Sequence, residues 1–279
     1  MTSLVDRGIS VFREDGALIL LKKTLQKVYR EIYCKSMAAR GHYSLKLTNR
    51  TVEFSAETPT LVRRNRQRFK SESKELRDFL GAIKEDDVVY DVGANTGLYS
   101  LFAAKKCPQG TVVAFEPYPP NIRVLQQDIT RNGLDNVTVI KSALSDSVGE
   151  IKFSQPNDDD IGYGSSSINT GGTREEITVP TTTGDTLVAD DKIPPANVVK
   201  IDVEGAEPLV LDGLEQVLSA PSCRVVYCEV HLPGVSKRPS IQDFGSSLEE
   251  LEFRLKEWGF SVQRLQTKGD SEITLKAKK

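Results

Sequence analysis

The sequence has few cysteines and histidines and no long apolar run, and each shortage argues against a class of protein. Its cysteines form no Cys-x-x-Cys pair, which argues against a zinc or disulfide framework and favours reduced thiols in a cytosolic protein; they are Cys34, Cys107, Cys223 and Cys228. No apolar run approaches the roughly 18 residues that span a bilayer, and no signal peptide is recognisable. We therefore expect a cytoplasmic protein without a membrane-spanning helix.

An excess of charge of one sign is also missing. The 37 Lys and Arg residues nearly balance the 39 Asp and Glu residues, and the net charge of −2 produces no overall field that attracts nucleic acid. With 38% hydrophobic residues the composition is that of an ordinary globular protein. A chain of 279 residues can hold one large α/β domain with an appendage. We predict an extension over residues 1–71 and a main domain over residues 72–279.

The most informative stretch runs from residue 88 to residue 103. It opens with a β-branched apolar run, passes through Gly93 and Gly97, and continues with apolar residues at helical spacing. This pattern predicts a strand, a tight turn and a helix whose first N–H groups point at a ligand. Asn95, between the glycines, tolerates left-handed backbone. The spacing differs from the Gly-x-Gly-x-x-Gly dinucleotide motif, and the preceding acid, Asp91, suits a ligand whose near end is cationic.

A second strand over residues 111–115 ends at Glu116, nineteen residues after Gly97. A βαβ unit places a carboxylate at about this distance, where it accepts hydrogen bonds from ribose hydroxyls. Glu116 is thus a candidate ribose ligand, and the alternative is an acid at a solvated strand end. The two features together predict that this half of the fold binds adenosine.

Strands and helices continue to alternate after Glu116. We predict further core strands over residues 137–141, 198–203 and 224–228, and a closing hairpin over residues 260–265 and 272–275. Residues 151–154 and 177–181 are expected to form a second hairpin. The insert between them, residues 155–176, is either a functional lid or disordered.

The N-terminal part has a different pattern. Residues 18–32 predict a basic amphipathic helix, which either lies on a membrane surface or, as most such helices do, docks on its own domain. A small hairpin over residues 43–54 is expected beside the main sheet. Residues 63–70 contain five cations, which either clamp an anion or form a solvated basic face; they show too little aromatic interleaving for nucleic-acid binding.

Several segments together resemble the FkbM-type family of class I S-adenosylmethionine-dependent methyltransferases. They occur in the family's order between about residues 72 and 265: Asp91-Val-Gly-Ala-Asn-Thr-Gly-Leu-Tyr-Ser100, Phe115-Glu-Pro117, Ala143-Leu-Ser-Asp146, Gly164-Ser-Ser166, Lys200-Ile-Asp-Val-Glu-Gly-Ala-Glu207 and Glu229-Val-His231. A Thr-Leu-Asp step common in the family is altered here, as Thr183-Gly-Asp-Thr-Leu187.

The resemblance implies an α/β fold: a doubly wound, seven-stranded, mostly parallel Rossmann-like sheet with helices on both faces, in which the last hairpin inserts one antiparallel strand. It also implies S-adenosylmethionine as cofactor and methyl transfer to an oxygen. By position, Asp91, Gly93, Asn95 and Gly97 would surround the methionine part, Glu116 the ribose, and Ser142 with Ala143 the adenine edge.

Methyl transfer to a hydroxyl requires a group that takes its proton. The candidates at the carboxyl ends of the predicted strands are His231, Asp202, Glu204, Glu207 and Glu229, and among them His231 is favoured because the chain has only one other histidine. All of these except Glu207 could instead gather a divalent metal. We favour the reaction without a metal, since two acids at spacing i, i+2 at a strand end are common without one.

Two other functions remain open from the residues. An NAD-linked oxidoreductase or epimerase is disfavoured by the missing third glycine and by the absence of a Tyr-x-x-x-Lys motif. A non-catalytic scaffold, bound to membranes through the N-terminal helix, is the second. The acceptor is expected to be a sugar, a glycan, a lipid-linked saccharide or another small hydroxylated metabolite, and no nucleic-acid partner is expected.

Overall fold

The computed structural model describes residues 4–154, 161, 176–234, 238–265 and 271–279; for residues 4–18, 20 and 154 it describes the backbone alone. The main sheet has the strand order β11-β12-β10-β9-β3-β4-β5. Its strands are β3 (Val88–Val92), β4 (Thr111–Phe115), β5 (Val137–Ile140), β9 (Val198–Ile201), β10 (Val225–His231), β11 (Ser261–Arg264) and β12 (Glu272–Lys278). Of these seven strands, β12 alone runs in the opposite direction to the rest, since it pairs antiparallel with both β10 and β11; this confirms the predicted insertion of one antiparallel strand.

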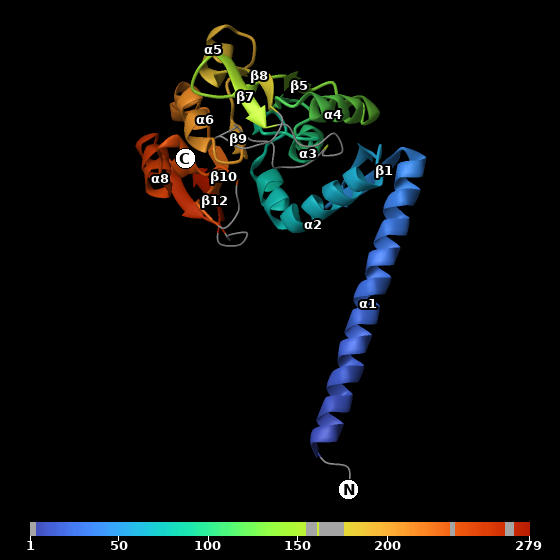
Figure 1. The fold of residues 1–279 in the computed structure, drawn as a ribbon. Helices are drawn as coiled ribbons and strands as arrows, with labels where there is room; N and C mark the ends of the chain where they lie inside the picture. The colour runs from blue at the N-terminus through green and yellow to red at the C-terminus, as the bar shows by residue number, and fades with distance from the viewer. Residues whose placement is uncertain (1–3, 155–160, 162–175, 235–237, 266–270) are drawn as a thin grey trace.

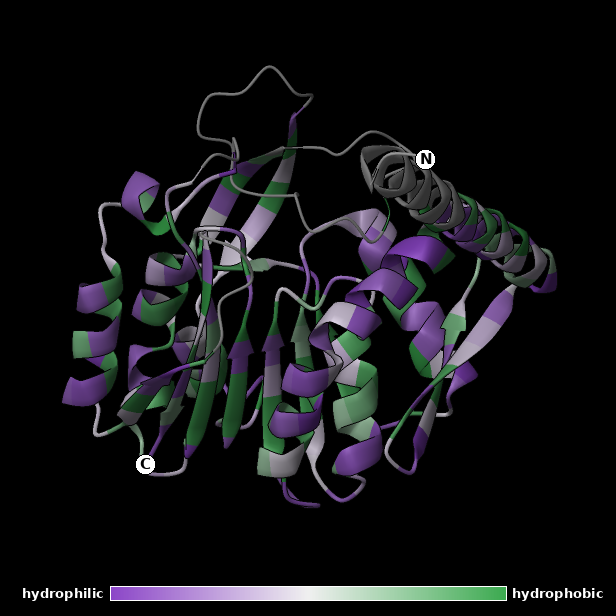
Figure 2. Cartoon of the chain, turned by 90° about the horizontal axis from the view of Figure 1, so that it is seen from below, coloured by the Kyte–Doolittle hydropathy of each residue, from purple (hydrophilic) through white to green (hydrophobic). Residues whose placement is uncertain are grey.

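Helices cover both faces of this sheet (Figure 1). One layer contains α2 (Pro59–Ala82), α3 (Leu98–Lys106) and α4 (Pro119–Arg131), and the other contains α5 (Gly184–Ala189), α6 (Glu207–Gly213), α7 (Glu215–Ser219), the 3-10 helix η1 (Ile241–Phe244) and α8 (Leu248–Glu257). Along β3, Val89 packs in the first layer and Tyr90 in the second, because successive side chains of a strand point to opposite faces. The strands are accordingly apolar over much of their length (Figure 2). The doubly wound α/β fold is confirmed.

The N-terminal hairpin forms as predicted, but its predicted position beside the main sheet is wrong. Strands β1 (His42–Leu47) and β2 (Arg50–Ser55) make a separate two-stranded sheet. It is fixed to α4 by side chains: the amide of Asn132 bonds the backbone of Glu53, and the backbone N–H of Ser55 donates to Asp128 over 2.7 Å. The buried Asp128 and the half-buried Asn132 at the end of α4 thus hold the hairpin on the helical layer.

A small third sheet contains β6 (Ala143–Leu144), β7 (Gly149–Ser154) and β8 (Glu176–Thr182). Its β7–β8 pair is antiparallel and confirms the second predicted hairpin. Except for Ile161 and Glu176, the insert for which a lid was considered lies outside the described residues.

Helix α1 (Leu4–Arg40) extends away from the rest of the molecule (Figure 1). Its last turns pack on α2, where the guanidinium of Arg66 donates a 2.8 Å hydrogen bond to the Tyr33 hydroxyl. Further toward the N-terminus an apolar stripe is exposed to solvent; its described members are Ile19, Leu21, Leu25, Val28, Tyr29 and Ile32. Docking of this stretch on its own domain is therefore wrong. In the part of the chain that the structure describes, no helix combines the length and the apolar character needed to cross a bilayer.

Helix α2 runs without a break through the predicted boundary between residues 71 and 72. It begins at Thr58, whose side chain accepts the N–H of Leu61, with Pro59 in the first turn. The predicted boundary between the extension and the main domain therefore falls inside a single helix, α2.

Candidate active site

A cavity of about 410 Å³ opens at the carboxyl ends of the core strands, within the usual size of a small-molecule site. Nine of the residues singled out in the sequence line it: Gly93, Asn95, Glu116, Ser142, Ala143, Asp202, Glu204, Glu229 and His231. Two predicted cofactor residues, Asp91 and Gly97, are not among the described residues of the lining. The sheet thus brings residues separated by more than 130 positions to one edge.

The turn between β3 and α3 packs tightly against the end of β9. Gly93 has a φ of 81°, and a Cβ at this position would lie 1.9 Å from the carbonyl oxygen of Asp202. Asn95 also has positive φ, 55°, and its side-chain oxygen accepts the N–H of Thr96 over 2.7 Å. Glycine at residue 93 is therefore required by backbone conformation and by space alike.

Asp91 and Gly97 lie next to this turn but outside the cavity lining, and they contact the helices that pack against it. The carboxylate of Asp91 is buried and accepts a 2.5 Å hydrogen bond from the Ser100 hydroxyl on α3. At Gly97, a Cβ would lie 2.4 Å from a methyl group of Leu125. In this structure these two residues fix α3 against β3 and α4.

Glu116 is buried beside the turn and organises it. One oxygen accepts the backbone N–H of Asn95 over 2.7 Å and the other that of Tyr118 over 2.9 Å. Burial raises the pKa of Glu116 to about 7, although these two hydrogen bonds act in the opposite direction. The oxygen bonded to Tyr118 also accepts the side-chain N–H of Asn121 over 3.4 Å, so the oxygen bonded to Asn95 is the one with a lone pair left for a hydroxyl donor.

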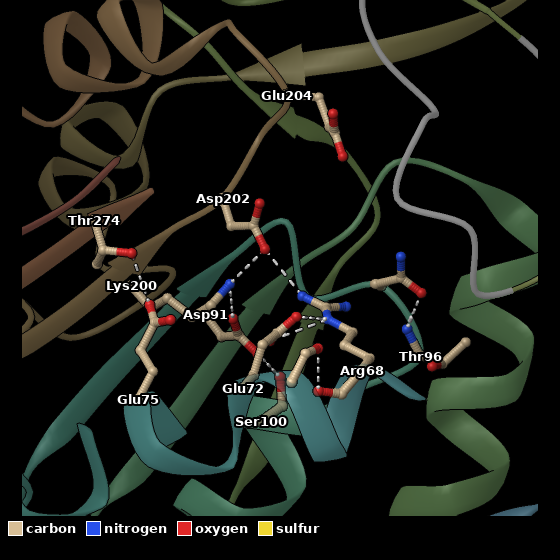
Figure 3. A network of polar contacts seen from close by, with 12 residues as sticks. Arg68, Glu72, Glu75, Asp91, Thr96, Ser100, Lys200, Asp202, Glu204 and Thr274 are labelled. Carbon is tan, nitrogen blue, oxygen red and sulfur yellow. Dashed lines mark hydrogen bonds and ion pairs between the residues drawn. The ribbon is translucent and has the colours of Figure 1, made fainter. Parts of the chain in front are cut away.

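A network of charges links α2 to the ends of β3 and β9 (Figure 3). Arg68 on α2 donates to Asp202 over 2.9 Å and pairs with Glu72, while the buried Lys200 ammonium lies 3.2 Å from the same Asp202 oxygen and 3.8 Å from Asp91. Burial lowers the pKa of Lys200, but the two aspartates outweigh it and raise the pKa above its ordinary value. Sequence reasoning missed Arg68 as a site residue; the cationic run at residues 63–70 was the only signal.

His231 and Glu204 face each other at the other end of the cavity. Nδ1 of His231 makes a 2.7 Å hydrogen bond with the buried carboxylate of Glu207, and Nε2 lies 3.7 Å from the carboxylate of Glu204. Burial lowers the pKa of His231, but Glu207 and Glu204 outweigh this effect and raise it to about 10. The ring of the free protein is therefore doubly protonated and positively charged at neutral pH, and its role as proton acceptor stays a prediction.

Glu204 has an unusual backbone conformation for its residue type. Its φ is 54°, and the next residue, Gly205, also has positive φ. Burial raises the pKa of Glu204 to about 7, partly offset by the nearby His231. Left-handed backbone at a residue other than glycine persists only where its surroundings hold it, and such residues cluster at functional sites.

Comparison with known proteins assigns the chain to a family. Residues 91–262 match the model of the methyltransferase FkbM domain, so the protein belongs to this family and is a methyltransferase dependent on S-adenosylmethionine. The hexuronic acid methyltransferase AglP of Haloferax volcanii is 32% identical over 200 residues, covering 72% of this chain and 79% of that protein. The 31-O-demethyl-FK506 methyltransferase FkbM of Streptomyces tacrolimicus is 29% identical, covering 64% of this chain and 75% of the relative.

Among solved structures, a putative rRNA methylase from Clostridium thermocellum superposes with a TM-score of 0.46 at 15% identity. The match covers 74% of this chain and 93% of that structure.

The cavity fits S-adenosylmethionine. Glu116 presents a buried carboxylate at the position predicted for the ribose, and the apolar Phe153 and Leu144 lie with Ala143 on the side predicted for adenine. Carboxylates at the opposite side favour the positive sulfonium. Between the two cofactors considered from the sequence, the family decides for S-adenosylmethionine over NAD.

We expect Glu116→Ala to weaken S-adenosylmethionine binding by about 1.5 to 3 kcal/mol, or 10- to 150-fold, because it removes a charged hydrogen-bond acceptor. The pKa of about 7 also makes binding pH-dependent. If Glu116 has its predicted role, only its ionised form accepts a ribose hydroxyl, and affinity should fall about tenfold as the pH is lowered from 8 to 6. Calorimetric titration measures both effects. Glu116→Gln is the control, with a flat profile over this range; an equally steep profile in that variant would assign the pH dependence to another group.

Proposed function

We propose that the protein transfers the methyl group of S-adenosylmethionine to a hydroxyl oxygen of a saccharide. The name of one relative specifies a hexuronic acid as substrate, and that of another specifies an O-demethyl compound. The observation that carries the proposal is the arrangement of the cavity, in which the cofactor turn and Glu116 adjoin a wall with a buried carboxylate, Glu204, and a buried imidazole, His231. Such a wall can orient a hydroxyl and take its proton.

The protein's part in this reaction is mainly orientation and proton transfer. When bound, S-adenosylmethionine supplies an already activated methyl group. The hydroxyl oxygen forms the new bond to carbon while the carbon–sulfur bond breaks, and the hydroxyl proton leaves to a base on the protein. We assign this base to Glu204, because it lines the cavity, has left-handed backbone, and has its carboxylate 3.7 Å from Nε2 of His231.

Transfer of a labelled methyl group to a panel of neutral sugars, hexuronic acids and lipid-linked saccharides tests the proposal. We expect a methylated saccharide whose label survives mild alkali, because a methyl ether is stable there whereas a methyl ester of a carboxyl group is hydrolysed. Alkali-labile label would contradict methylation of a hydroxyl. Transfer to a polyketide alcohol but to no saccharide would contradict the substrate class.

We also propose that α1 attaches the protein to an anionic membrane that carries a lipid-linked acceptor. The exposed apolar stripe of α1 lies beside cationic side chains, and only Glu31 opposes them within residues 21–32; the cations are Lys22, Lys23, Lys27 and Arg30. A helix with these two faces binds at an interface by burying its apolar side and pairing its cations with lipid headgroups.

The full-length protein is therefore expected to float with phosphatidylserine-containing liposomes at low salt and to be released as salt screens the lysines. Neutral liposomes should bind it less. A matched pair of variants separates the two contributions: Leu25→Asp with Ile32→Asp should abolish binding, while Lys22→Gln with Lys27→Gln should lower only its dependence on anionic lipid. If the unaltered protein stays unbound and instead self-associates through α1, the stripe is an interface between copies.

A further inference from the structure

The register of two neighbouring strands brings three potential metal ligands together. Strands β9 and β10 pair in parallel with Ile201 opposite Cys228, so Asp202 follows at the level of Glu229. His231 lies two residues further along β10, on the same face as Glu229 because strand side chains alternate. The three side chains each offer one ligand atom, and these atoms all lie within 4.8 Å of one another. All three residues line the cavity.

The orientation of His231 is that of a ligand held in place by a neighbour. Its Nδ1 is held by Glu207, a carboxylate that is fully buried and also accepts the N–H of Gly205 over 3.0 Å. A metal-bound histidine characteristically has its second nitrogen bonded to such a carboxylate, which fixes the direction of the first. The Nε2 lies 3.7 Å from the carboxylate of Glu204, beyond hydrogen-bond distance, although the residue is 97% buried and lines the cavity. A buried ring nitrogen whose contact with the described residues is only this long ion pair is able to bind a further ligand.

The charge of the cavity agrees with a bound cation. Among the described lining residues, six carboxylates outnumber three guanidinium groups and the charged ring of His231; the acids are Glu72, Glu116, Asp202, Glu204, Glu229 and Glu272, and the guanidinium groups are Arg64, Arg68 and Arg238. One sulfonium balances only part of this excess. Buried carboxylates gathered in this way are stabilised by pairing with cations or by coordinating metals.

We propose that Asp202, Glu229 and His231 form a binding site for a divalent cation of the Mg²⁺ or Mn²⁺ type, a departure from the reaction without a metal favoured by the sequence. Carboxylate oxygens suit these ions, and Mn²⁺ also accepts an imidazole. The role of this cation rests on the proposed function: beside Glu204 it would lower the pKa of the acceptor hydroxyl and hold the hydroxyl oxygen in position. The cation displaces the proton from Nε2, since metal ligands bind deprotonated.

Titration of the full-length, chelator-treated protein with Mn²⁺ tests the site directly. The free aqueous ion has a sharp paramagnetic resonance signal that disappears on binding, and neither cofactor nor acceptor is needed. We expect one saturable site per chain, occupied at Mn²⁺ concentrations below about 1 mM. Glu229→Gln and His231→Gln should each weaken binding by at least about tenfold. Mg²⁺ should displace Mn²⁺ from the same site.

Glu272→Gln is the matched control. Glu272 lies opposite His231 on the neighbouring strand and lines the same cavity, so the substitution removes the same charge without removing one of the three ligands. Its Mn²⁺ affinity should stay within about threefold of wild type. Absence of a saturable site in the wild type, or equal weakening in all three variants, overturns the inference. Because the titration contains no substrate, methylation of a compound other than a saccharide would overturn the proposed function and leave the cation site standing.

Discussion

Glu204→Gln is expected to lower kcat for methyl transfer by about 10² to 10⁴-fold, the usual contribution of a general base. The amide keeps the size of the side chain and cannot take up the acceptor proton. S-adenosylmethionine affinity should change by less than about threefold, because the predicted cofactor contacts lie on the other side of the cavity. Single-turnover kinetics with labelled cofactor, together with calorimetric binding, separates these two quantities.

Glu272→Gln again provides the control for this prediction. Arg238 pairs with both Glu204 and Glu272, so Glu272→Gln perturbs the same ion pair while leaving the proposed base in place. We expect it to lower kcat by less than about tenfold, as for a partly exposed ion pair. Equal losses in the two variants would show that Arg238 is what the reaction needs. Full activity in Glu204→Gln would move the proton acceptor to Glu229, Asp202 or His231.

Gly93→Ala is expected to damage both stability and cofactor binding. The added methyl group would lie 1.9 Å from the Asp202 carbonyl, so either the turn or the end of β9 has to move. Left-handed strain and overpacking together should cost about 2 to 4 kcal/mol of unfolding free energy. Displacement of the turn moves Asn95 and the N–H that it donates to Glu116, and affinity for S-adenosylmethionine should fall by at least about tenfold.

Gly133→Ala separates strain from crowding. Gly133 also has positive φ, 60°, but a Cβ there meets no atom within 4 Å. This control should cost only about 1 to 2 kcal/mol and leave cofactor binding unchanged. Chemical denaturation and calorimetry measure both variants. If Gly93→Ala lowered the unfolding free energy no more than Gly133→Ala and retained cofactor affinity, close packing of the turn on β9 would contribute to neither stability nor cofactor binding.

Local patterns in the sequence predicted much of the fold and several residues that line the cavity. The β-branched run before Gly93 and the helical spacing after Gly97 predicted β3, its turn and α3, because backbone preference and burial act over a few residues. Glu116 could be placed in the same way, since a βαβ unit has a nearly constant length. The order of the motifs also indicated the family, and with it the antiparallel β12.

Contacts between distant elements could not be obtained in this way. Whether the exposed stripe of α1 is covered by the domain depends on the direction in which α1 leaves α2, and helical periodicity carries no information on that direction. The hairpin β1–β2 was recognisable from its alternating apolar and polar residues. Its position on α4, however, depends on buried side chains such as Asp128, and no sequence pattern links Asp128 to the hairpin.

The sequence by itself determined the strand and helix pattern, the glycine turn between β3 and α3, and the presence of acids after β9 and in β10. Only the tertiary structure decided that Arg68, 134 residues before Asp202, pairs with it, and that Glu207 holds the ring of His231. The physical reason is that a strand's residues show which side chains share a face, whereas their neighbours across the cavity depend on strand order and helix packing.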